Sequence, residues 1–265
     1  MNHNTRLWGG RFRKSPDPRM MKLSSAAGAH ARLAPQDIAG GKAHAAELER
    51  AGLLSQDELK TIVAALDGIA GDLAAGTLAP DESDEDVHTF IERVLIARIG
   101  ATGAKLRAGR SRNDQAANNL KLYLRAEARS IGAMLAELLE AIAGQAERHA
   151  ASVCPGFTHL QSAQPVTFGH WLMAHGQALS RDASRLQDWE KRSSLSPLGA
   201  AALAGSAIAL TPELSARALG YDGPCENSVD AVGARDHVAE FLFVSAMLAT
   251  NLSRLAEEVT LWTSR

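Results

Sequence analysis

The chain has 265 residues, a formal net charge of -2 at pH 7, 46% hydrophobic residues and only 5% aromatic residues. The near-neutral charge argues against a nucleic-acid groove or an anionic membrane as partner, because both attract strongly basic surfaces. Abundant alanine with few aromatic residues favours closely packed helices over a sheet sandwich. We therefore expect an all-α protein, long enough for one large domain or two modest ones.

The sequence carries no signal for export or membrane insertion. No apolar run follows a basic start, and no stretch of about 18 uncharged apolar residues occurs, which predicts a cytoplasmic protein. Cys154 and Cys225 lack the spacing of metal ligands. Two reduced thiols are therefore expected, rather than a disulfide or a metal site.

Glycine and proline break up the first 30 residues, and short helices are expected after them. The patterns predict helices over 35–51, over 55–76 and from residue 83 to residue 100. The second begins with a capping box, in which Ser55 and Glu58 satisfy each other's backbone N–H groups. Three acidic residues at the start of the third suit the positive end of a helix.

Longer helices follow. Leucine and isoleucine recur at helical spacing over 111–150, which at about 1.5 Å per residue predicts a helix roughly 60 Å long. Two more long helices are expected over 168–191 and 229–262, and no convincing strand pair appears. Helices of this length with an apolar seam belong in bundles. We expect a helical N-terminal domain over 1–108 and a long-helix bundle domain over 109–265 that needs further helices, from beyond this sequence or from other subunits.

Positive charge gathers at the start of the longest predicted helix. The cations are Lys105, Arg107, Arg110 and Arg112. Each opposes the helix dipole by about 0.3–1 kcal/mol, unless an anion binds where free N–H groups and positive charge converge. Ordinary helix capping would explain Ser111 and Asp114, and solvated surface arginines remain an alternative for the cations.

A second cluster, over residues 155–165, packs a hydroxyl, an imidazole and two amides between prolines. Proline fixes φ and stiffens a loop, which suits preorganised groups. His159 could act as acid or base near neutral pH, although a lone loop histidine more often binds nearby backbone groups. The remaining histidines form no metal-ligand pattern, and no glycine-rich phosphate loop is present.

Several short motifs together resemble the argininosuccinate lyases of the aspartase and fumarase superfamily. They are Leu7-Trp-Gly-Gly-Arg-Phe12, Arg32–Ile38, Glu85-Asp-Val-His88, Gly109-Arg-Ser-Arg-Asn-Asp-Gln115, Gly156-Phe-Thr-His-Leu-Gln161, Ser196-Pro-Leu-Gly199 with Ala202–Gly205, and Arg235-Asp236 with Ser253–Glu258. Each is short, but their order and spacing are specific. The motifs over 156–161 and 196–205 correspond to loops. Those over 109–115 and 156–161 resemble the superfamily's first two signatures.

The resemblance implies a small helical domain followed by a long-helix bundle. It also implies a cytoplasmic homotetramer in which four subunits pool their helices and each active site draws on three chains. The implied reaction is β-elimination of argininosuccinate to L-arginine and fumarate, in arginine biosynthesis, without a cofactor. Binding the succinyl carboxylates is much of the catalytic work, because negative charge builds on one of them.

The resemblance also assigns site residues. It makes His159 the catalytic histidine, and it makes Ser111, Arg112, Asn113, Thr158 and Gln161 substrate-binding residues. Ser25 and His88 are further candidates for substrate binding, and no metal ligand is implied.

Three departures from the family pattern keep other functions open. The third signature, which supplies the catalytic serine, is expected shortly after Arg265. Ala26 and His30 stand where the family has a serine and an aspartate, and Ala117-Asn-Asn119 replaces a usual threonine and aspartate. The alternatives are a non-catalytic protein on the lyase scaffold, as in delta-crystallins, and a superfamily lyase that acts on adenylosuccinate or aspartate.

Overall fold

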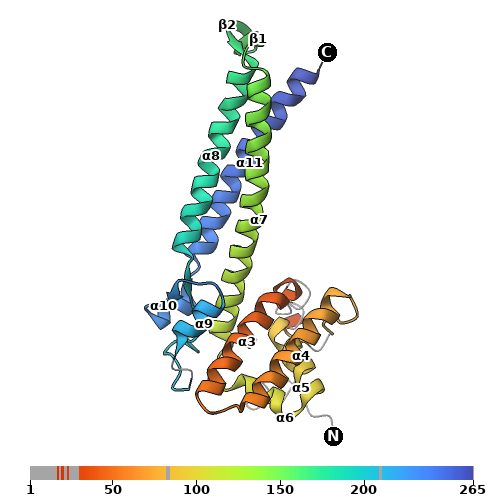
Figure 1. Ribbon diagram of the computed structural model, residues 1–265, viewed down its shortest axis with the longest axis vertical. Coiled ribbons are helices and arrows are strands. Elements are labelled where there is room, and N and C mark those ends of the chain that lie inside the picture. The colour runs from red at the N-terminus through yellow and green to blue at the C-terminus, as the bar shows by residue number, and fades with distance from the viewer. Residues whose placement is uncertain are drawn as a thin grey trace. The chain divides into compact units, whose positions relative to one another are not determined.

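The computed structural model describes residues 17, 19–20, 23, 30–81, 84–208 and 211–264. It divides into two compact units, Met1–Ala108 and Gly109–Arg265. Helices dominate both units, and the strands are few and short (Figure 1). The expectation of an all-α fold is confirmed.

The N-terminal unit is built from short and medium helices. They are η2 (Ala31–Leu33), α3 (Ala34–Arg50), α4 (Gln56–Ala74), α5 (Val87–Ile99), α6 (Ala101–Ala104) and η3 (Lys105–Arg107). The capping box of α4 is confirmed, since the Ser55 hydroxyl accepts the Glu58 N–H at 3.2 Å and the Glu58 carboxylate accepts the Ser55 N–H at 3.0 Å. The prediction for α5 was wrong at its start. Asp86 caps this helix through the N–H of Thr89.

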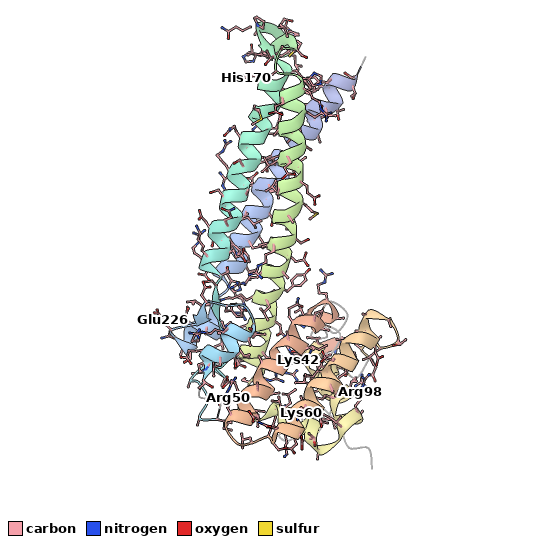
Figure 2. All side chains as sticks on the ribbon, in the orientation of Figure 1. Lys42, Arg50, Lys60, Arg98, His170 and Glu226 are labelled. Atoms are coloured by element: carbon pink, nitrogen blue, oxygen red, sulfur yellow. The ribbon has the colours of Figure 1, made fainter. Side chains whose placement is uncertain are left out.

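The core of this unit is mostly aliphatic. Its fully buried side chains include Leu48, Ile62, Leu66, Ile69, Phe90 and Leu95. Cationic side chains such as Lys42, Arg50 and Arg98 lie around the outside (Figure 2), where they pair with acids of the same unit. The unit therefore has its own core and its own charged surface.

Three long helices form the second unit. α7 (Arg112–Arg148), α8 (Phe168–Arg192) and α11 (Asp236–Thr263) run side by side (Figure 1). At one end lie α9 (Pro212–Ala218), α10 (Ser228–Gly233) and a two-residue parallel pairing of β3 (Leu195–Ser196) with β4 (Gly223–Pro224). A hairpin of β1 (Val153–Thr158) and β2 (Gln161–Thr167) projects from the other end.

The third long helix is shorter than predicted. The chain leaves the helical conformation at Ala234, so that α10 and α11 are separate helices. The Arg235 guanidinium donates to the carbonyl oxygens of Val232 and Ala234, at 3.1 and 2.6 Å, and so satisfies acceptors at the end of α10. This local capping outweighs the continuous helical pattern of the sequence.

Apolar side chains fill the space between the three helices in two clusters. One centres on the fully buried Trp189 and includes Leu124, Leu186 and Val244. The other, nearer the hairpin, includes Leu135, Ile142, Leu172 and Leu179. α11 adds the buried Val244 to the first cluster and the partly buried Leu248 and Leu255 to the second. Its exposed large apolar side chains are Leu242, Phe243, Leu252, Val259, Leu261 and Trp262.

Among the described residues, α11 alone is long and apolar enough to cross a membrane, with a mean hydropathy of 1.3 over 18 residues. Its acidic side chains nevertheless bind α8. Glu240 pairs with Arg192, and Glu258 with His175. These ion pairs, together with the packing of Val244, make α11 an integral part of the helical unit.

The hairpin contradicts the expectation that no strands pair. Thr158 faces Gln161, and the turn between them consists of two residues, His159 and Leu160, with φ of 53° and 59°. Two-residue hairpin turns of this kind usually carry asparagine, aspartate or glycine. The strands also contain Pro155 and Pro165, which is why the sequence predicted a stiff loop here instead.

Candidate active site

The start of α7 is capped as the sequence predicted. The Ser111 hydroxyl accepts the Asn113 N–H at 3.3 Å, and the Asp114 carboxylate accepts the Ser111 N–H at 3.2 Å. Asp114 is almost completely buried, and this burial raises the pKa of its carboxyl, although hydrogen bonds from Ala201 and Gly199 act in the opposite direction.

A loop over residues 196–205 folds onto this helix start. The second carboxylate oxygen of Asp114 accepts the N–H groups of Gly199 and Ala201, at 3.2 and 2.9 Å. The Asn113 amide donates to the carbonyl oxygen of Ala202 at 2.9 Å. Ser111 and Arg112 are half-buried and Asn113 is exposed, so the loop orders the helix start while leaving it accessible to a ligand.

Two of the four cations in the predicted cluster have acidic partners. Lys105 pairs with Glu58, and Arg107 pairs with Glu92 at 3.1 Å, inside the N-terminal unit. Arg110 and Arg112 flank Ser111 in the sequence. Backbone N–H groups and two arginines at a helix start suit a carboxylate ligand.

The second predicted group lies on the hairpin. Thr158, His159 and Gln161 are all exposed, and within the described chain none of their side chains makes a hydrogen bond. The turn places His159 in the left-handed region, which costs most residues about 1–2 kcal/mol. Such strain is often found where a fold presents a functional side chain.

These two groups lie at opposite ends of α7 (Figure 1). The helix has 37 residues, which corresponds to about 55 Å. A proton acceptor must come within about 3 Å of the proton that it removes. Within one copy of the chain, His159 therefore cannot act on a molecule held by Ser111 and Asn113.

The remaining candidates lie in the N-terminal unit. His88 is buried, and its Nδ1 lies 2.6 Å from a carboxylate oxygen of Asp37. Ser25 and the Leu7–Phe12 motif fall outside the described residues. A role of Ser25 or His88 in substrate binding stays a prediction.

The structure also shows buried polar residues that the sequence analysis did not single out. Lys121 and Arg125 lie one helical turn apart on α7 and donate to backbone carbonyl oxygens, including Leu195 at 3.1 Å. Beside them, burial and the charge of Lys121 lower the pKa of His237 to about 4. The spacing of Lys121 and Arg125, four residues apart on one face of the helix, could have signalled this cluster.

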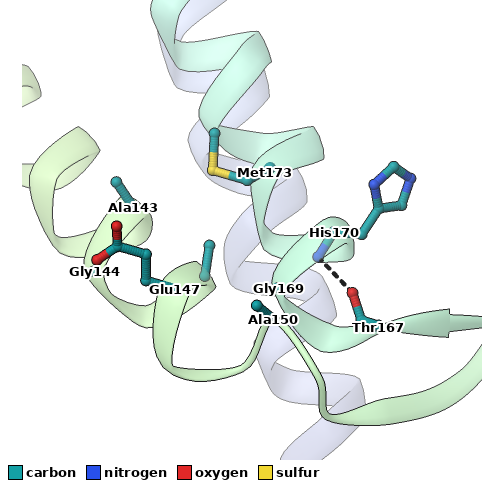
Figure 3. Close-up of a pocket in the computed structure, with 9 residues that line it drawn as sticks. Ala143, Gly144, Glu147, Ala150, Thr167, Gly169, His170 and Met173 are labelled. Carbon is teal, nitrogen blue, oxygen red and sulfur yellow. Dashed lines mark hydrogen bonds between the residues drawn. The ribbon is translucent and has the colours of Figure 1, made fainter.

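No group of three or more histidine, cysteine, aspartate or glutamate side chains in the described ranges is arranged to hold a metal. Cys154 and Cys225 are separate thiols, as expected. A surface groove of about 500 Å³ lies where α7 meets α8 near the hairpin (Figure 3). Small residues line most of it, with Glu147 and His170 at its edge. None of the predicted site residues lines this groove.

A sequence profile described as lyase matches residues 10–265. The chain belongs to this lyase family. It is 59% identical over 260 residues to argininosuccinate lyase 1 of Pseudomonas fluorescens. This alignment covers 98% of the chain and 55% of that relative. It is 57% identical over 265 residues to argininosuccinate lyase 2 of Rhizobium meliloti, covering 100% of the chain and 54% of that relative. The chain thus spans about half the length of the curated relatives it matches.

Solved structures agree with this membership. A variant of EDDS lyase with bound fumarate superposes with a TM-score of 0.79 at 32% identity, covering 95% of the chain and 50% of that enzyme. A fumarate lyase of the delta-crystallin kind from Brucella melitensis, solved with cobalt, reaches a TM-score of 0.77 at 20% identity, covering 96% of the chain and 59% of that protein. The second likeness concerns the fold alone.

Proposed function

We propose that this chain forms the first half of an argininosuccinate lyase, which cleaves argininosuccinate to L-arginine and fumarate for arginine biosynthesis. The observation that carries the proposal is the match to curated argininosuccinate lyases at 57–59% identity over almost the entire chain. The fumarate bound to the related EDDS lyase variant suits the same product chemistry.

Each end of α7 has one part in the proposed reaction. Ser111, Arg112 and Asn113 hold a succinyl carboxylate at the helix start, where positive charge and N–H groups stabilise the carbanion that forms. Thr158 and Gln161 contact the substrate beside His159, which takes part in proton transfer. A base removes a proton from the succinyl carbon, and the resulting carbanion expels the guanidinium nitrogen. The C–N bond breaks, which releases L-arginine and leaves fumarate.

The length of α7 supports a site shared between copies. If the two ends act on one substrate, they come from different chains, as in a cytoplasmic homotetramer that pools its bundle helices. The exposed apolar side chains of α11 offer a surface for that assembly. The rest of the site, including the serine expected after Arg265, comes from the portion that the longer relatives have.

The test is fumarate release from argininosuccinate, followed by absorbance, with and without the second half of the Pseudomonas fluorescens relative. We expect activity only with the added half, and its loss on His159→Ala or Asn113→Ala. Activity of the 265-residue chain alone would contradict the role of the later serine. No fumarate release in any combination would favour a non-catalytic protein on the lyase scaffold. Release from adenylosuccinate or aspartate instead would identify a different lyase.

A further inference from the structure

The hairpin that carries Thr158, His159 and Gln161 is attached to the helices at one small junction. The N–H of Phe168, the first residue of α8, donates to the carbonyl oxygen of Ser152 at 2.8 Å. The next N–H, that of Gly169, donates to the carbonyl oxygen of His149 at 3.1 Å. The position of the hairpin therefore depends on how the first turn of α8 is held.

Aromatic rings surround that first turn. The Phe168 ring lies against His149, with centroids 5.3 Å apart, and is stacked on Trp171 with centroids 6.2 Å apart. Trp262, near the end of α11, packs on Phe168 with a centroid separation of 4.8 Å and also contacts Trp171. The last turn of α11 thus covers the base of the hairpin.

A polar contact near the hairpin joins the same two helices. His175 lies two turns into α8 with 7% of its side chain exposed, and its Nε2 lies 3.0 Å from a carboxylate oxygen of Glu258 on α11. The His175 ring also contacts Trp171, at 4.6 Å between centroids. A directional contact between the buried His175 and the partly exposed Glu258 limits the rotation of a helix more narrowly than apolar packing does.

We propose that the cluster of Phe168, Trp171, His175, Glu258 and Trp262, here called the hairpin clamp, positions the hairpin and with it His159. None of the clamp residues is among those proposed to bind substrate, so they act as positioning residues. The catalytic part of this inference rests on the proposed function. The structural part, that α11 controls the hairpin, stands on the contacts alone.

Hydrogen–deuterium exchange on the 265-residue chain tests the structural part. In Glu258→Ala and in Trp262→Ala, amides of the hairpin should exchange about tenfold faster, whereas amides of α9, at the other end of the unit, should keep their rates. Glu257→Ala is the matched control, because Glu257 is the exposed neighbour on α11. Trp262→Phe should restore most of the protection.

Unchanged hairpin exchange in both alanine variants would overturn the proposal. Equal acceleration at the hairpin and at α9 would overturn it too, since the clamp would then only stabilise the unit as a whole. In the complemented enzyme, the same variants should lower kcat about tenfold and also raise KM, because the hairpin carries His159 together with the substrate-binding Thr158 and Gln161. If the complemented enzyme proves inactive, the proposed function fails while the exchange measurement still decides the clamp.

Discussion

The carboxylate of Asp114 accepts the N–H of Ala201 across 2.9 Å and so joins the first turn of α7 to a loop that comes 87 residues later. The same oxygen also accepts the N–H of Gly199. One buried side chain therefore organises both the helix start and the loop folded over it, beside the residues proposed to bind a carboxylate.

Replacing Asp114 with asparagine should disturb this loop. Both oxygens of the Asp114 carboxylate accept backbone N–H groups. Asparagine has an NH2 group in place of one oxygen, so at least one buried N–H loses its acceptor. We expect the free energy of unfolding to fall by about 1–3 kcal/mol, as measured by urea denaturation. Glu140→Gln, on an exposed position of the same helix, should change it little. An equal loss in both variants would contradict this role of Asp114.

Alanine should have opposite effects on stability at two glycines near the hairpin. A Cβ on Gly169 would lie 2.3 Å from the carbonyl oxygen of Ala146, whereas a Cβ on Gly144 would meet nothing within 4 Å. Gly169→Ala should force α7 and α8 apart and cost about 1–3 kcal/mol. Gly144→Ala should raise the free energy of unfolding by as much as about 1 kcal/mol, because alanine has the higher helix propensity. Thermal denaturation of the pair checks both signs, and similar melting temperatures would contradict the close approach.

Because the hairpin turn is left-handed, replacing Leu160 with glycine should stabilise the hairpin. This side chain is 79% exposed and its φ is 59°, so glycine relieves backbone strain without removing packing. Hairpin amides should then exchange several-fold more slowly in Leu160→Gly. Leu160→Ala removes the same side chain but keeps the strain, so it should show no such slowing. Slower exchange in the alanine variant would mean that the leucine side chain, rather than the backbone, is unfavourable.

His237 makes stability depend on pH. Burial, followed by the charge of Lys121, lowers its pKa in the folded chain to about 4, from 6.5. The unfolded chain therefore binds the proton first as pH falls, and stability should decrease from about pH 6.5 to about pH 4. The loss amounts to roughly 2–3 kcal/mol. His237→Phe should flatten this part of the urea-denaturation profile, and an unchanged slope would contradict the assignment.

Much of the helical architecture could be predicted from sequence because capping residues and apolar spacing act locally. Ser55 with Glu58, and Ser111 with Asp114, begin their helices as expected. The start of α5 was misplaced because Asp84, near the expected start, binds Arg93 at 2.8 and 2.7 Å, a contact nine residues away. Local patterns carry no information on such pairings.

The candidate site was predictable only as two separate groups. Motif resemblance pointed to Asn113 and to His159. It did not predict that His159 lies on a hairpin. That hairpin has prolines in its strands and no glycine in its turn, and Phe168, which follows it, packs against Trp262 of α11, nearly a hundred residues later. Long-range contacts of this kind are settled by packing, which a reading of local sequence does not reach.

The length of α7 has a consequence for genetics. If sites are built between copies as proposed, a change at Asn113 and a change at His159 damage different ends of each chain. An assembly that mixes the two kinds of chain would then contain some sites whose helix start and hairpin are both unaltered. Two inactive variants would restore fumarate release when mixed in the complemented enzyme, so an organism with one copy of each could make arginine although neither copy suffices by itself.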